Sequence, residues 1–238
     1  MFGWFKKQSG YSKDISPFAD YMCQGIPEAL VMPSELIALF NWIDKARLVH
    51  EYPEIPSVIK SKRYGVLIAD TYASSKKLTI SGNCVSFERD DKKTVQYWFN
   101  STNPEIFERL FIFCRTCDDG SMAALWLDDE GQTRIVHMGS GSGSTWVGLI
   151  GETPVDFLRF LAIPYPEHCW PEHFDFTPDE LEIGEHPLPN EPYQKWVIDT
   201  FKTTIPQKAR QIIAVSPQMG EAQQGSDAFS RWVDGVCA

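Results

Sequence analysis

The segment from residue 118 to residue 163 constrains the fold more than any other part of this chain. It contains three apolar runs, separated by two turn-forming stretches and followed by a helix start. The runs are 122–127, 134–138 and 145–150, and the turn-forming stretches are 128–131, which is acidic, and 139–144, which holds only Gly and Ser. Short apolar runs between such turns predict β-hairpins. Thr153-Pro154, ahead of the acidic Asp156, predicts the first turn of a helix. The segment therefore predicts two hairpins and a docked helix.

The rest of the chain predicts further helices and strands. Ser34 is the expected N-cap of a helix with one apolar face. That face consists of Leu36, Ile37, Leu39, Phe40 and Ile43. Four strand-like runs follow at 64–69, 77–80, 84–88 and 94–99. Two more helices are expected, from Asn103-Pro104 to Leu110 and from about Pro192 to Thr203.

These elements predict an α+β fold, with a twisted, mostly antiparallel sheet packed by helices. The length fits a single domain with extensions. We expect the domain at 31–203, an N-terminal extension at 1–30 packed on the core, and a C-terminal extension at 204–238. The last of these is rich in Gln, Gly and Ser beyond Ser216, which predicts that it is partly loose.

The charge of the chain is concentrated in one region. Residues 116–194 hold fifteen Asp and Glu against two Arg, a net charge of −13, in a chain of net charge −10. A field of this sign repels nucleic acid and attracts basic proteins. We therefore expect a protein partner and no nucleic acid, although a solvated acidic face alone would give the same pattern.

Apolar stretches in the chain are too short to span a bilayer, so no membrane association is expected. Residues 1–7 place apolar residues ahead of the lysines, the reverse of a secretory signal. The six scattered cysteines fit reduced thiols better than a disulfide framework. These features predict a cytoplasmic protein and leave its oligomeric state open.

Each candidate catalytic or metal motif fails in its sequence context. The Gly/Ser stretch 139–144 is followed by a strand-like run, whereas a phosphate loop needs a helix there, so a flexible hairpin loop is expected. Cys114 and Cys117 form a single C-x-x-C without a second pair, which predicts two buried or half-buried thiols. His168 and His173 lie five residues apart, which is not the helical spacing of zinc hydrolases. We expect no catalytic centre, no metal and no cofactor.

Three parts of the opening segment resemble the SUKH superfamily, which is named partly for fungal cell-wall-assembly regulators. They are the Gly-Ser turn and strand at 120–127, the strand at 135–140 and the helix at 154–163. The order and spacing of these parts match those of the family. The Asn-Gly-Gly that usually ends the family's first helix is missing here, and the last 45 or so residues have no assigned counterpart.

This resemblance implies a non-catalytic α+β domain, and many bacterial members look like immunity proteins that bind and neutralise a toxin. The acidic region agrees, because nuclease toxins have basic clefts that a negative surface can occupy. The leading hypothesis is therefore an immunity protein that binds a basic, nuclease-type toxin domain. The expected partner-binding residues are Asp118, Asp119, Asp128, Asp129, Glu130 and, as an aromatic anchor, Trp146, although a core position for Trp146 is the stronger expectation.

Two alternatives remain open. The first is an intracellular regulatory or scaffold protein of the cell-wall-assembly-regulator type, which would account for the long Gln/Gly/Ser tail. The second is a metal- or thiol-dependent enzyme. Its candidate residues are His137, His168, His173, Cys114 and Cys117.

Overall fold

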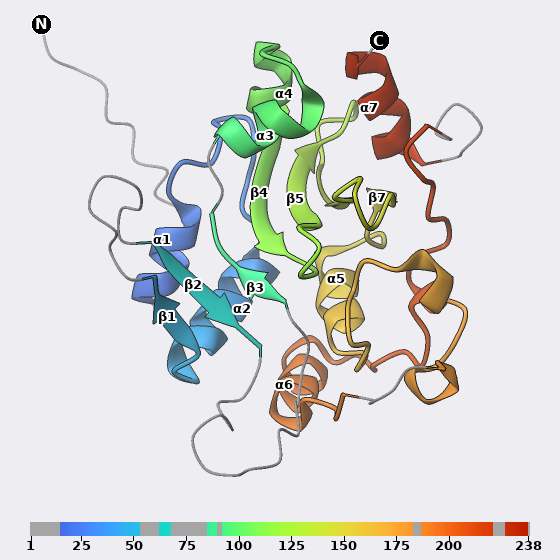
Figure 1. Cartoon of the computed structure of the whole chain (residues 1–238). Coiled ribbons are helices and arrows are strands. Elements are labelled where there is room, and N and C mark those ends of the chain that lie inside the picture. The colour runs from blue at the N-terminus through green and yellow to red at the C-terminus, as the bar shows by residue number, and fades with distance from the viewer. Residues whose placement is uncertain are drawn as a thin grey trace, which may run out of the picture.

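A computed structural model describes residues 15–52, 62–67, 85–89, 92–182, 187–220 and 227–237. Within these residues the chain forms one seven-stranded sheet with helices on both faces (Figure 1). The strands are β1 (Val49–Glu51), β2 (Arg63–Val66), β3 (Ser86–Phe87), β4 (Leu110–Arg115), β5 (Met122–Leu127), β6 (Thr133–Met138) and β7 (Val147–Leu149). The α-helices are α1 (Pro17–Cys23), α2 (Ser34–Lys45), α3 (Lys92–Phe99), α4 (Pro104–Arg109), α5 (Pro154–Leu161), α6 (Glu191–Phe201) and α7 (Ala228–Cys237). The short 3₁₀ helices are η1 (Pro171–His173), η2 (Pro178–Glu180) and η3 (Ala209–Gln211).

The sheet is antiparallel throughout the described residues, and its strands lie side by side in chain order from β1 to β7. The two hairpins expected between residues 118 and 150 are β5–β6 and β6–β7, and the expected helix is α5. Thr153 caps α5 and forms a capping box with Asp156. The α+β class predicted from the sequence is therefore confirmed. None of the helices in the described part of the chain is long and apolar enough to cross a membrane.

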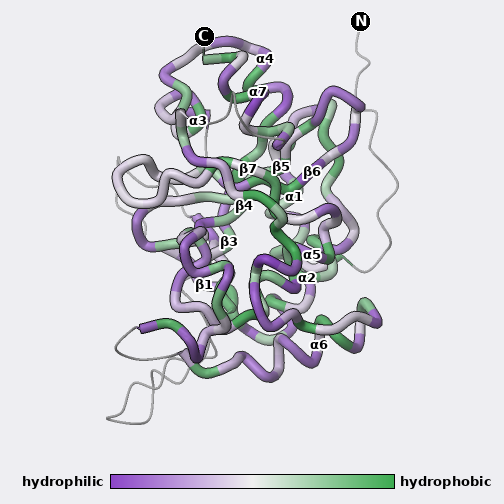
Figure 2. Tube along the Cα trace, turned by 90° about the vertical axis from the view of Figure 1, so that its right-hand side faces the viewer, coloured by the Kyte–Doolittle hydropathy of each residue, from purple (hydrophilic) through white to green (hydrophobic). Residues whose placement is uncertain are grey.

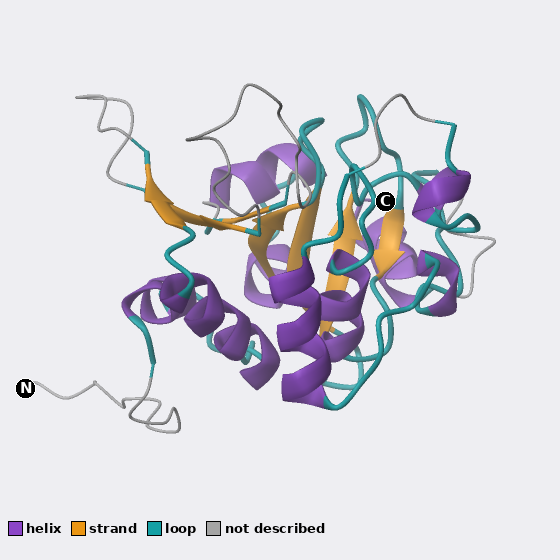
Figure 3. Ribbon diagram, turned by 90° about the horizontal axis from the view of Figure 1, so that it is seen from below, coloured by secondary structure: helices purple, strands orange, loops and turns teal. Residues whose placement is uncertain are grey.

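Two hydrophobic cores form because side chains of each strand alternate between the two faces of the sheet. On β4, Phe111 and Phe113 belong to a first core with α1, α2, α5 and α6. Leu110 and Ile112 belong to a second core with α3, α4 and α7. Helices accordingly lie on both sides of the strands in Figure 3. Burial on both faces explains why the central strands are hydrophobic at nearly every position, as Figure 2 shows.

The free edge of β7 is covered by the C-terminal part of the chain. The backbone N–H of Val147 donates to the carbonyl of Pro217 at 2.9 Å, and that of Leu149 donates to the carboxylate of Asp227 at 2.8 Å. Asp227 also accepts a hydrogen bond from the N–H of Ser230, in the first turn of α7. An edge strand with unpaired backbone groups invites wrong pairing. The C-terminal extension at 204–238 was expected to be partly loose. Its residues 217 and 227–237 are docked on the sheet.

Other expectations are corrected by the structure or lie outside its described part. The run 94–99 was expected to be a strand, and this is wrong because it forms most of α3. Ser34 is the first residue of α2, and its N-cap is Pro33. The strand-like runs at 64–69 and 84–88 are represented by the shorter β2 and β3. The run 77–80 lies outside the described residues.

Candidate partner-binding surface

The acidic residues predicted to bind a partner lie in two turns at opposite ends of β5. Asp118 and Asp119 belong to the turn between β4 and β5, whereas residues 128–130 belong to the turn between β5 and β6 (Figure 1). A strand of six residues separates two such turns by about 20 Å. The predicted acidic surface is therefore two surfaces, which have to be considered separately.

Asp128 builds the β5–β6 turn. One of its carboxylate oxygens, Oδ1, accepts hydrogen bonds from the N–H of Glu130 at 3.0 Å and of Gln132 at 2.7 Å. The other, Oδ2, faces Arg134 Nε at 3.4 Å, and the side chain is only 9% exposed. Gly131 completes the turn with a φ of +77°, which favours glycine. Asp128 lies in a turn, as predicted, but its carboxylate is used in hydrogen bonds within that turn and in the contact with Arg134.

Asp129 and Glu130, in contrast, project from this turn into solvent. The side chain of Asp129 is 82% exposed and accepts a hydrogen bond from Arg109 Nη2 at 2.7 Å. Arg109 is itself part of the fold, because its Nε donates to the carbonyl of Leu127 at 2.9 Å. Its guanidinium also lies over the ring of Trp232 in α7, 5.2 Å from the centroid. The guanidinium that pairs with Asp129 is thus tied into the fold.

Further carboxylates surround the β5–β6 turn. Glu105 of α4 pairs with Arg109 at 3.1 Å, and Glu108 is exposed on the same helix. Glu152, ahead of α5, pairs with Arg134 at 3.5 Å and is 80% exposed. We call this surface the acidic end. Its exposed carboxylates are Glu105, Glu108, Asp129, Glu130 and Glu152.

At the opposite end of β5, Asp119 holds a loop together. Its carboxylate accepts hydrogen bonds from the N–H of Ser121 (2.7 Å) and of Ser144 (2.8 Å). It also accepts from the hydroxyls of Ser121 (3.0 Å) and Ser140 (2.8 Å). Partial burial acts to raise the pKa of Asp119, but these hydrogen bonds outweigh it and lower the pKa from 3.8 to about 2. Asp119 therefore serves the fold, and Asp118 is its exposed neighbour.

Trp146 does not reach the surface. Its side chain is 0% exposed, and its ring stacks on His137 with centroids 4.0 Å apart and an interplanar angle of 12°. Phe174 packs edge-on against the same indole. The assignment of Trp146 as a partner anchor is wrong, because the whole indole is used in the core.

Two of the three histidines of the enzyme alternative, His137 and His168, are engaged in structural hydrogen bonds. His137 is fully buried, with Nε2 at 3.0 Å from the Thr116 hydroxyl and Nδ1 at 3.0 Å from the carbonyl of Trp146. His168 is also fully buried, and its Nε2 lies 3.0 Å from the carbonyl of Phe160. Burial lowers the pKa of each imidazole from 6.5 to about 4. Both rings are therefore neutral at physiological pH and contact backbone or hydroxyl groups of the core.

The cysteines are buried as the sequence predicted, but not as a C-x-x-C pair. Cys114 is 0% exposed and belongs to the first core, beside Phe113. Cys117 is 3% exposed, and its sulfur lies near Glu167 and Cys169 instead. Two neighbouring cysteines in sequence are thus directed into different environments.

The sequence missed the carboxylates of Glu105, Glu108 and Glu152, although a signal for two of them exists. The helix that carries Glu105 and Glu108 runs directly into β4, and Leu110 at the start of β4 pairs with Trp126 at the end of β5. A helix just before β4 must therefore lie beside the turn just after β5. The register between β4 and β5 has to be known before this proximity can be deduced.

Comparisons with known proteins provide no relative for this chain. No protein-family model, no curated protein and no solved structure matches it.

Proposed function

We propose that this chain is a non-catalytic immunity protein, which neutralises a bacterial toxin of the nuclease type by covering a basic surface of the toxin with the acidic end. The observation that carries the proposal is the clustering of the five exposed carboxylates of the acidic end around the β5–β6 turn. Arg109 and Arg134, which pair with some of these carboxylates, also donate hydrogen bonds to backbone carbonyls. The resemblance to the SUKH superfamily supports the same class of function.

The acidic end is suited to steering a basic partner. An exposed ion pair contributes only about 0.2–1 kcal/mol, so these carboxylates act together and chiefly on the association rate and on specificity. A basic nuclease cleft is shaped to hold phosphates, and the carboxylates clustered around the β5–β6 turn offer it negative charges. Because the charges are exposed, added salt weakens the complex.

The proposed function is tested by protection from the toxin. A nuclease-type toxin domain encoded beside the gene is expressed in a bacterial host with and without this chain. We expect growth arrest by the toxin alone, rescue by the chain, and co-purification of the two proteins from the rescued cells. Growth arrest that persists at full expression of the chain would contradict the proposal, as would the absence of any toxin gene beside this one.

A further inference from the structure

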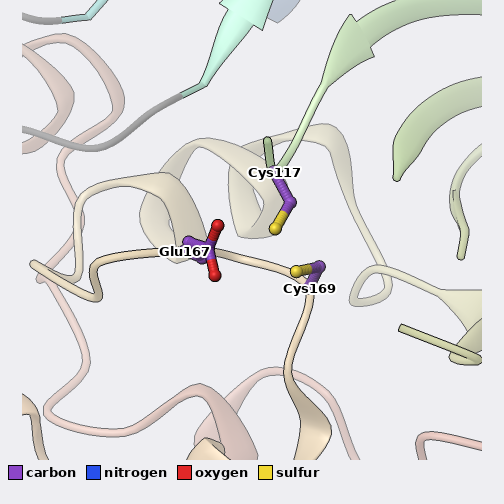
Figure 4. A group of neighbouring side chains, drawn as sticks. All are labelled: Cys117, Glu167 and Cys169. Atoms are coloured by element: carbon purple, nitrogen blue, oxygen red, sulfur yellow. The ribbon is translucent and has the colours of Figure 1, made fainter. Parts of the chain in front are cut away.

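A second cluster of chemically active side chains lies away from the acidic end, where the β4–β5 turn meets the segment that follows α5. Cys117 comes from the turn, and Glu167 and Cys169 come from the segment. The two sulfurs and a carboxylate oxygen all lie within 4.8 Å of one another. Figure 4 shows the three side chains directed into one common space.

The backbone brings these groups together from both sides. The N–H of His168 donates to the carbonyl of Thr116 at 3.3 Å, which joins the two segments next to the cluster. The hydroxyl of Ser144 donates to the carbonyl of Cys169 at 2.5 Å. His168 points away, toward the carbonyl of Phe160. Its two chain neighbours, Glu167 and Cys169, therefore share the opposite side of the segment.

The carboxylate of Glu167 is oriented by a further contact. The indole Nε1 of Trp170 donates a hydrogen bond to Glu167 Oε2. Hydrogen bonds of this kind fix the direction of metal-binding carboxylates and are a regular feature of metal sites. This hydrogen bond holds the carboxylate through one oxygen, and a carboxylate can coordinate a cation through the other.

We propose that Cys117, Glu167 and Cys169 form a binding site for a thiophilic divalent cation, of which Zn²⁺ fits best. Thiolates with a carboxylate are ligands that zinc accepts. In a tetrahedral zinc site, bonds of about 2.3 Å to sulfur and 2.1 Å to oxygen place the ligand atoms about 3.6–3.8 Å apart. The observed separations, all within 4.8 Å, need only side-chain adjustment to reach this range.

Cysteine coordinates a metal ion as the thiolate, so the cation has to displace the thiol protons when it binds. On binding, each S–H bond is replaced by an S–Zn bond and its proton passes to solvent, so that up to two protons are released per cation. Water would occupy the fourth position of the tetrahedron.

The site is tested with Co²⁺ as a spectroscopic replacement for Zn²⁺, using the reduced full-length chain. We expect one equivalent of Co²⁺ to produce a thiolate-to-cobalt charge-transfer band together with the ligand-field bands of a tetrahedral site. One equivalent of Zn²⁺ should abolish these bands and release protons in weakly buffered solution. Failure to bind either metal when the thiols are reduced would overturn the proposal. Isolation of the chain with a disulfide between Cys117 and Cys169 that excludes metal would also overturn it.

Variants locate the ligands. C117S and C169S should lose the charge-transfer band and more than about 100-fold in affinity, because even the loss of a group that only orients a ligand costs about 10–100-fold. E167Q alters a partly exposed side chain, so it keeps the fold; it should retain the band and lose at least about tenfold in affinity. C114S is the matched control, since Cys114 is equally buried on the adjoining strand. A loss of cobalt binding in C114S equal to that in C117S would contradict the assignment.

Discussion

The carboxylate of Asp119 accepts a 2.8 Å hydrogen bond from the backbone N–H of Ser144, which joins the β4–β5 turn to the loop between β6 and β7. Two glycines of that loop allow close approaches that a side chain would block. A Cβ on Gly143 would lie 2.5 Å from Asp119 Oδ2, and a Cβ on Gly139 would lie 2.5 Å from the carbonyl oxygen of Ser144. The expected hairpin loop is present, and it encloses a carboxylate of the protein itself.

Replacement of Asp119 by Ala should destabilise the protein by about 2–3 kcal/mol, because several donors would lose a charged acceptor at once. The measurement is urea unfolding at neutral pH. D118N, at the exposed neighbouring position, should stay within about 0.5 kcal/mol of the wild type. Equal effects of the two substitutions would show that the loop does not depend on Asp119.

Acidification should destabilise the fold through His137 and His168. The folded-state pKa of each imidazole is about 4, below its ordinary value of 6.5. Between these values the unfolded chain binds protons that the folded chain does not, so stability is full above pH 6.5 and is lost as the pH falls toward 4. We expect a loss of about 1 kcal/mol per imidazole between pH 6 and pH 5, measured by urea unfolding at each pH.

The variant H137Q serves as the control for this pH dependence. One titrating imidazole is removed, so the slope of unfolding free energy against pH should fall by about half between pH 6 and pH 5. An unchanged slope would show that His137 is not responsible, and a stability that rises on acidification would contradict the burial of both rings.

Replacement of Arg109 by Met should weaken the docking of α4, the β5–β6 turn and α7. Met keeps much of the apolar stem but removes the hydrogen bonds to Asp129 and Leu127 and the contact with the Trp232 ring. We expect a loss of about 1–3 kcal/mol in unfolding free energy. K195M, which removes the exposed pair between Lys195 and Asp199, should leave the unfolding midpoint unchanged.

Replacement of Phe229 by Ala tests whether α7 belongs to the core. Phe229 is 0% exposed and packs on Trp126, with ring centroids 5.3 Å apart. The substitution leaves a cavity and should lower the free energy of unfolding by about 3–5 kcal/mol, as measured by chemical denaturation. V236A, a partly buried position near the end of the same helix, should cost less than F229A. A negligible effect of F229A would mean that the C-terminal segment is loose, as its composition suggested.

Local signals in the sequence were sufficient for the segment from β5 to α5. Turn residues separate its apolar runs, and Thr153 with Asp156 supplies a complete helix cap, so each element is specified by its own residues. The run 94–99 was misjudged because its aromatic and β-branched residues favour strands. Its buried positions follow the spacing of a helix instead, because Val95 and Phe99 are buried and Tyr97 is 89% exposed.

The candidate surface was predictable only in part. Exposure of Asp129 and Glu130 followed from their position in a turn, but nothing local showed that Asp128 and Asp119 would be used to build turns and loops. The proximity of Cys117 to Cys169 is a tertiary contact between separate segments, and the C-x-x-C spacing of Cys114 and Cys117 gives no indication of it. Such pairings depend on packing rather than on spacing along the chain.

Charge reversal at the acidic end tests the proposed interface most directly. Glu108 and Glu130 are changed to Lys, which spares Asp129 and its contact with Arg109. The matched control reverses two exposed carboxylates elsewhere, in E172K/D179K. Affinity for a catalytically inactive toxin domain, encoded beside the gene, is measured by calorimetry at low and at high salt. We expect E108K/E130K to bind at least about tenfold more weakly, a change of about 1.4 kcal/mol, and to lose much of the salt dependence. Wild-type affinity in E108K/E130K, or an equal loss in E172K/D179K, would contradict the account.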